Sequence, residues 1–136
     1  MDILVPCSPN NPIPTYVAAA FNSYSPHPQP GYAYYREGKF SCGYFMQGSE
    51  QGDFLEDGYY LLMGGNVSFR PHREVPENLR FKVGSTKDYK PIYIGTIYIS
   101  GEEICGPVID GVCYVYRHSI LSDGENYKVL GLNEGC

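Results

Sequence analysis

Short runs of aromatic and β-branched residues recur along the chain, and each is bounded by Gly, Pro, Asn, Asp or Ser. Such runs are typical of β-strands, because these side chains pack well on a pleated surface and the bounding residues favour turns. The pattern predicts strands over residues 16–21, 32–36, 59–63, 80–84, 92–99, 112–117 and 127–130. Only the first of these runs also suits a helical turn, because it contains three consecutive alanines.

Four dipeptides that end in glycine have the composition of hairpin turns. They are Asp57-Gly58, Ser100-Gly101, Asp110-Gly111 and Asp123-Gly124. Tight hairpin turns need positive φ values, which glycine, asparagine and aspartate tolerate best. Evenly spaced strands joined by such turns predict an all-β sandwich, barrel or prism.

The two halves of the chain resemble each other. Residues 35–43 and 98–106 share a Tyr-x-x-Gly-x-x-x-Cys-Gly frame at an offset of 63 residues. Repetition at this spacing indicates two structural repeats that share one core. The predicted fold is therefore all-β, with two pseudo-symmetric antiparallel β repeats packed into one compact prism- or sandwich-like domain.

The repeats also define the expected domain organisation. A single domain covers residues 1–136, with repeat one at about 13–64, a linker at about 65–74 and repeat two at about 75–132. The residues expected to be buried between the sheets are Tyr93, Ile97, Val112, Tyr114 and Val129.

Composition and charge narrow the class of protein. Apolar residues make up 43% of the chain and charged residues 18%, which is typical of globular proteins. Fourteen tyrosines favour strands and exclude a helix bundle or a coiled coil, and no apolar run is long enough to span a bilayer. We therefore expect no membrane insertion. The net charge of −5 argues against nucleic acid as a partner.

The cysteine pattern bears on redox state and location. The odd number of cysteines and the lack of a Cys-x-x-Cys pair favour free thiols over a zinc site or a disulfide framework. A clasp between Cys7 and Cys136, or an intermolecular bridge, is the alternative. Cys42 and Cys105 occupy equivalent positions and are expected in the core. The first residues lack the pattern of a secretory signal, so we expect a cytoplasmic protein, or a secreted one if a signal was removed or an unconventional route is used.

Five segments of the second half carry a family resemblance. They are Val-Gly at 83–84, Pro-Ile-Tyr-Ile-Gly at 91–95, Ser-Gly-Glu at 100–102, Gly-Val-Cys-Tyr-Val at 111–115 and Asn-Tyr-Lys-Val-Leu at 126–130. In this order they resemble a repeat of the DM-nine repeat family of invertebrate proteins, more clearly over 75–132 than over 13–64. The resemblance implies a tandem-repeat, all-β lectin that binds mannose-type glycans, often as a homodimer and often in innate immunity.

The sequence departs from the family at positions that hold sugar hydroxyls. The family's arginine falls at Thr96 and Ala33, its lysine falls at Pro107 and Tyr44, and its Gly-Gly-x-Glu-His segment falls at residues 118–122. The resemblance therefore implies the scaffold, and mannose binding is not carried over residue by residue.

A polar turn in the second half offers the groups that a sugar site needs. Lectin sites pair an aromatic face with polar groups that bind hydroxyls. Asp88 would accept hydrogen bonds, Lys90 would donate them and Tyr89 would stack on a sugar ring, while Glu102 and Glu103 in the next turn would face the same groove.

The first half offers Asn22, Lys39 and Tyr44 at comparable places. The alternative for all of these residues is an ordinary solvated turn without a ligand.

The sequence carries no catalytic motif, and its three histidines have no metal-binding spacing. We therefore expect no enzymatic activity, no cofactor and no metal site. The leading hypothesis is a carbohydrate-binding, lectin-like protein that recognises a glycan or a glycan-bearing surface, as a homodimer. One alternative is a non-catalytic protein-interaction or structural module that has lost sugar binding, and another is the recognition module of a pore-forming assembly.

Overall fold

The computed structural model describes residues 4–8, 11, 14–20, 29–36, 39–46, 51–55, 59–64, 66–86, 88–116 and 120–133. Within the strands, residues 20, 35–36, 39–40, 44–46, 51–55 and 59 are described by their backbone alone.

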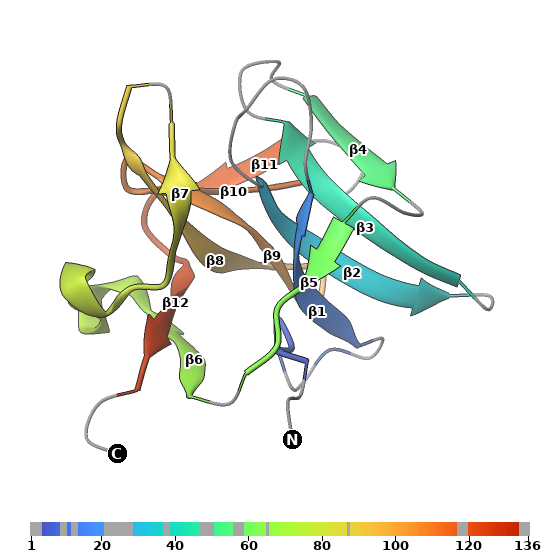
Figure 1. Ribbon diagram of the computed structural model, residues 1–136, viewed down its shortest axis with the longest axis horizontal. Coiled ribbons are helices and arrows are strands. Elements are labelled where there is room, and N and C mark those ends of the chain that lie inside the picture. The colour runs from blue at the N-terminus through green and yellow to red at the C-terminus, as the bar shows by residue number, and fades with distance from the viewer. Residues whose placement is uncertain are drawn as a thin grey trace.

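The first half of the chain forms a five-stranded antiparallel sheet with the strand order β4-β3-β2-β1-β5 (Figure 1). Its strands are β1 (Thr15–Ala20), β2 (Gln29–Arg36), β3 (Lys39–Met46), β4 (Gln51–Leu55) and β5 (Tyr59–Leu61). Consecutive strands lie side by side from β1 to β4, and β5 returns to pair with the outer edge of β1.

The second half forms a seven-stranded antiparallel sheet with the order β11-β10-β9-β8-β12-β6, in which β7 also pairs with β8. Its strands are β6 (Val67–Pro71), β7 (Lys82–Ser85), β8 (Pro91–Ile99), β9 (Glu102–Ile109), β10 (Val112–Tyr116), β11 (Ile120–Asp123) and β12 (Lys128–Leu132). The described residues form no α-helix, only two 3-10 turns, η1 (His72–Glu74) and η2 (Glu77–Leu79). The all-β prediction is thereby confirmed. No helix among the described residues is long and apolar enough to cross a membrane.

Two of the predicted hairpin turns are present. Positive φ values at Ser100 (49°) and Gly101 (88°) join β8 to β9, and the same combination at Asp110 (53°) and Gly111 (80°) joins β9 to β10. Positive φ at both central residues is the geometry of a tight hairpin turn. Asp57-Gly58 lies outside the described residues.

The predicted hairpin at Asp123-Gly124 is wrong. Strand β11, which ends at Asp123, pairs with β10, whereas β12 pairs with β8 and β6. The bend after Asp123 therefore carries the chain from the edge strand β11 to a position between β8 and β6 in the same sheet.

The hairpins β2–β3 and β8–β9 have the same register at an offset of 63 residues. Ala33 pairs with Cys42 in the first hairpin, and Thr96 pairs with Cys105 in the second. This correspondence agrees with the shared sequence frame, while the boundaries of the two repeats stay a prediction. Strand β6 and turn η1 lie within residues 65–74, the span expected as a linker.

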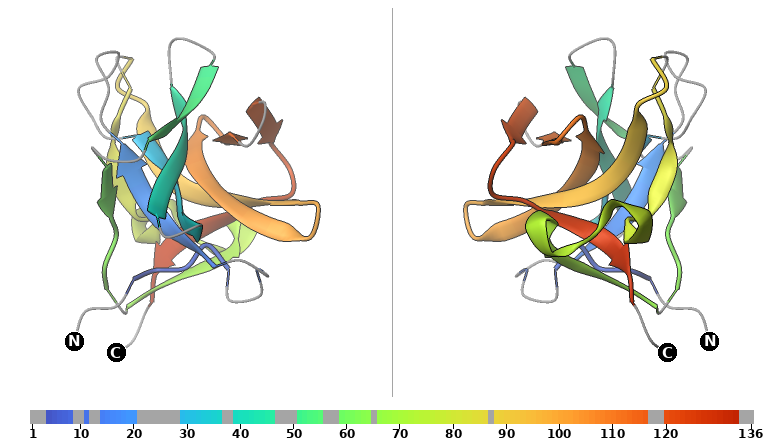
Figure 2. Two further views of the ribbon diagram at one scale, coloured as in Figure 1. Left: turned by 90° about the vertical axis from the view of Figure 1, so that its right-hand side faces the viewer. Right: turned by 90° about the vertical axis from the view of Figure 1, so that its left-hand side faces the viewer.

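One hydrophobic core lies between the two sheets. Val17 of β1 and Tyr32 of β2 belong to the same buried cluster as Ile94, Ile104 and Val108 of β8 and β9. Figure 2 shows the two sheets packed against each other, with the β8–β9 hairpin reaching beyond them. Burial of apolar side chains from both sheets is the main force that holds them together.

The predicted core is right in part. Three of its residues are buried, namely Tyr93, Ile97 and Val129. Val112 and Tyr114 are only half-buried, because β10 turns Cys113 and Val115 inward instead. Successive side chains of a strand point to opposite faces, so an error of one residue exchanges the two faces.

A disulfide joins Cys7 to Cys105. The expectation of free thiols is wrong for these two residues, and the partner of Cys7 is Cys105 rather than Cys136. The bond ties the N-terminal segment to β9 across 98 residues of sequence.

Two buried cysteines, Cys42 and Cys113, are free thiols. Burial raises the pKa of Cys42 to about 12, and burial together with the charge of Asp123 raises the pKa of Cys113. Burial and a raised pKa both disfavour the thiolate, which is the reactive form of cysteine.

Candidate functional site

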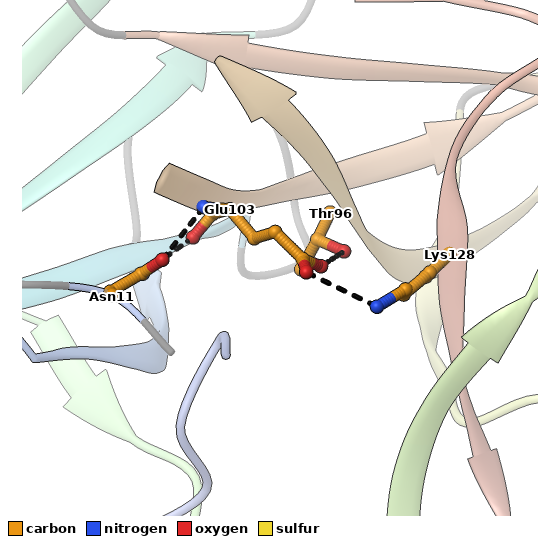
Figure 3. Close-up of polar contacts among 4 residues, drawn as sticks. All are labelled: Asn11, Thr96, Glu103 and Lys128. Carbon is orange, nitrogen blue, oxygen red and sulfur yellow. Dashed lines mark hydrogen bonds and ion pairs between the residues drawn. The ribbon is translucent and has the colours of Figure 1, made fainter. Parts of the chain in front are cut away.

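Glu103, near the start of β9, is hydrogen-bonded through both its side chain and its backbone. Its carboxylate accepts hydrogen bonds from Lys128 Nζ at 3.1 Å and from Thr96 Oγ1 at 3.2 Å (Figure 3). Its backbone N–H donates to Asn11 Oδ1 at 2.8 Å, and its backbone oxygen accepts from Asn11 Nδ2 at 2.8 Å. Thr96 of the same hairpin and Lys128 of β12 therefore hold the carboxylate, and Asn11 of the N-terminal segment holds the backbone of the same residue.

Strand register explains this cluster. Thr96 pairs with Cys105 on β9 and with Lys128 on β12, so Glu103 lies two residues along from the partner of Thr96. Residues that pair directly, or that are offset by two, present their side chains on the same face of a sheet. Tyr98 pairs directly with Glu103 and therefore shares this face.

A cleft of about 280 Å³ opens beside the cluster. The β8–β9 hairpin provides one wall, the segment before β12 provides another, and the end of β6 with η1 closes the third side. The residues most important for ligand chemistry are Arg73, Tyr98, Glu103, Asn126, Tyr127 and Lys128. Tyr98 is 71% exposed, whereas the side chain of Glu103 is only 16% exposed and that of Lys128 is 43% exposed. The aromatic ring is thus accessible, and the carboxylate is held at the cleft with its geometry fixed.

The wall before β12 is fixed by the carboxylate of Asp123. Its Oδ1 accepts hydrogen bonds from the backbone N–H of Glu125 at 2.8 Å and of Asn126 at 2.9 Å. Since these bonds stabilise the ionised form, the pKa of Asp123 lies below its ordinary value.

An aromatic pair adds a second support to the same wall. The rings of His72 and Tyr127 stack at a centroid distance of 4.0 Å, and the Nε2–H of His72 donates to the backbone oxygen of Glu125 at 2.9 Å. The loop and η1 therefore hold each other, so the cleft is largely formed before any ligand enters.

The predicted turn of Asp88, Tyr89 and Lys90 lies elsewhere. All three residues are exposed, and Tyr89 is 89% exposed with a positive φ of 64°. Lys90 Nζ forms an ion pair with Asp110 at 3.0 Å, and this hydrogen bond and charge raise the pKa of Lys90.

The structure does not bring this turn together with Glu102 and Glu103. Lys90 precedes the start of β8, whereas Glu102 pairs with Ile99 at its end, so they are separated by roughly 30 Å of strand at about 3.3 Å per residue. The expectation that both groups face one groove is wrong. Glu103 lies in the cleft, and its neighbour Glu102 is half-buried.

The candidate residues of the first half stay untested. Asn22 lies outside the described residues. Lys39 and Tyr44 belong to β3, where the structure describes their backbone and not their side chains.

Sequence reasoning missed Asn11, Thr96, Tyr98 and Lys128. A local signal was present for Tyr98, because a two-residue turn at Ser100-Gly101 fixes the pairing of residue 98 with residue 103. No local pattern indicates the approach of Asn11 or Lys128, which depends on long-range strand order.

No protein-family model matches this chain, and no curated protein matches its sequence. The resemblance to the DM-nine repeat family therefore stays a prediction, and the site must be interpreted from its own chemistry. An exposed aromatic ring, a fixed carboxylate, an ammonium group and an amide surround one small cleft. This combination suits a neutral ligand that is rich in hydroxyl groups.

Proposed function

We propose that the protein is a non-catalytic, lectin-like carbohydrate-binding protein, and that the sugar binds in the cleft beside Glu103. One observation carries the proposal. The exposed Tyr98 is the strand-register partner of Glu103 in the β8–β9 hairpin, and Glu103 forms an ion pair with Lys128 in the same cleft.

The chemistry of sugars explains the fit. One face of a sugar ring carries C–H groups that pack on an aromatic ring, while its hydroxyls both donate and accept hydrogen bonds. Glu103 can accept from hydroxyls, Lys128 can donate to them, and the amide of Asn126 can do both. Because the network already fixes Glu103, a ligand does not have to order it, and this lowers the entropic cost of binding.

The size of the cleft limits what binds there. A volume of 280 Å³ lies just below the usual range for ligand pockets, about 300–1,000 Å³, and suits one sugar unit. The family resemblance favours a mannose-type sugar, and it also favours a homodimer, which the mass of the protein in solution would test.

The disulfide favours an oxidising compartment for this function. Disulfides form and persist outside the cytosol, where glycans on surfaces are also encountered. Because the Cys7–Cys105 bond is a buried disulfide, we propose that the protein is secreted and does not act in the cytoplasm.

A glycan array followed by calorimetry on the best ligand tests the function. We expect Tyr98→Ala to lower the affinity for that ligand about tenfold or more, because the apolar contact between the tyrosine ring and the sugar ring is lost. Tyr89→Ala removes a comparably exposed ring from the other turn and is the matched control. A blank array, or equal loss in both variants, would reject the cleft as a sugar site.

A protein-interaction module is the second candidate. It is favoured by exposed tyrosines outside the cleft, Tyr60 at 66% and Tyr89 at 89%, since tyrosine is enriched at protein interfaces. In that case Tyr89→Ala weakens partner binding, Tyr98→Ala does not, and the array stays blank.

A further inference from the structure

A second hollow, of about 320 Å³, lies next to the cleft. It is formed between the N-terminal segment 5–8 and the first residues of β6, from Val67 to Phe69. Glu103 and Lys128 line it as well, so the ion pair is the wall that the two hollows share.

Strand β6 contributes residues to the lining of both hollows, and its length shows how far their combined lining extends. Residues 67–69 line the second hollow, and Pro71 lines the cleft. From the middle of the first group to Pro71 are three residues, which at about 3.3 Å per residue is roughly 10 Å. This is about the length of a disaccharide and is too long for a single ring.

The lining of the second hollow suits another sugar unit. Val5, Pro6, Val67 and Phe69 provide apolar surface for the C–H face of a ring. Val67 and Phe69 lie on the same face of the sheet as Lys128, because Lys128 pairs with Pro71 and Leu132 pairs with Val67.

The ion pair between Glu103 and Lys128 is accessible from both hollows. The ammonium group of Lys128 has three N–H donors, and one of them donates to Glu103. Because the side chain is 43% exposed, the other donors can reach hydroxyls on a ligand in either hollow.

We propose that the site binds oligosaccharides of at least two units, one in the cleft and the next in the second hollow, with the Glu103–Lys128 pair below the linkage. This inference rests on the proposed sugar-binding function and defines its ligand class.

The test compares the affinities of mono-, di- and trisaccharides of mannose, glucose, galactose and N-acetylglucosamine by calorimetry. In the series that binds, we expect the best disaccharide to bind about tenfold or more tightly than its monosaccharide, because a second ring face is buried. Equal affinities for the two would overturn the two-unit site and leave the single-unit site intact. If no sugar binds in any series, the proposed function fails and the inference fails with it.

A blocking variant locates the second unit. Val67→Tyr places a ring in the second hollow, because Val67 lines it and shares a face of the sheet with Lys128. We expect the gain from monosaccharide to disaccharide to disappear. Leu121→Tyr introduces the same ring at an exposed position of the edge strand β11 that lines neither hollow, and is the matched control. Melting temperatures check that both variants fold. A disaccharide gain that survives in folded Val67→Tyr would also overturn the inference.

Discussion

At the residue scale, one carboxylate sets the shape of the loop that lines the cleft. Asp123 accepts the backbone N–H groups of Glu125 and Asn126, and its pKa is lowered from 3.8 mainly by these two bonds. A group whose pKa falls on folding stabilises the loop fully above its unfolded pKa and loses that effect as the pH falls through its folded pKa. We therefore expect the loop to hold its shape at pH 5 and to loosen only below pH 3.8.

Backbone amide chemical shifts of Glu125 and Asn126 between pH 6 and pH 2 measure this effect. In Asp123→Asn the amide oxygen can still accept both bonds, so the loop should keep its shape and the acid transition should vanish. In Asp123→Ala the loop should be loosened at every pH. A transition at or above pH 3.8 in the native protein would contradict the lowered pKa.

At the scale of elements, the N-terminal segment acts as a support for β9. Its backbone pairs with the five-stranded sheet, where Cys7 N–H donates to the oxygen of Thr15, while its disulfide joins Cys105 of the other sheet. Asn11 then reaches the backbone of Glu103, two residues before Cys105.

Removing the disulfide should weaken both stability and the site. We expect the double variant Cys7→Ala/Cys105→Ala to lose about 2–5 kcal/mol in its free energy of unfolding, because a bond across 98 residues restricts the unfolded chain. Denaturant unfolding measures this loss. The Glu103 amide, which donates to Asn11, should also exchange faster with solvent.

A reducing agent provides the internal control. It should lower the stability of the native protein toward that of the double variant and leave the double variant unchanged. If reduction left the native protein as stable as before, the disulfide would contribute nothing to the free energy of unfolding.

Some strands of this fold can be predicted from the sequence, and others cannot. Strand β8 and the turns at 100–101 and 110–111 were predictable, because a run of aromatic and β-branched residues and the turn residues that follow it are local signals. Strand β9 escaped prediction, since it begins with two glutamates and contains a Gly-Pro pair. Tertiary pairing on both edges outweighs these weak local preferences.

The candidate site was less predictable than the fold. Glu103 was identified, but for a groove with Asp88 and Lys90 that does not exist. Its real partners depend on the packing of β12 beside β8 and on a disulfide that an odd cysteine count argued against. Strand order and disulfide pairing are properties of the folded chain, and no short motif encodes them.

At the scale of the whole molecule, the two sheets form one cooperative unit. The buried cluster takes Val17 and Tyr32 from the five-stranded sheet and Ile94 and Ile104 from the seven-stranded sheet. Neither sheet has a second apolar layer of this size among the described residues, since the other buried cluster contains only three small side chains. Loss of packing in one sheet should therefore also destabilise the other sheet.

Ile104→Ala tests this coupling, because Ile104 is 1% exposed at the centre of the shared cluster. We expect a loss of about 2–5 kcal/mol in the free energy of unfolding, from the lost apolar contact and the cavity left behind. Leu121→Ala, at a 37% exposed position on the edge strand β11, should cost about 0.5 kcal/mol or less. Unfolding should remain a single transition, and the amides of Val17 and Tyr32 should lose protection from hydrogen exchange together with those of β9. Two separate transitions, or lost protection confined to the seven-stranded sheet, would mean that each half folds on its own and that the site depends on the second half alone.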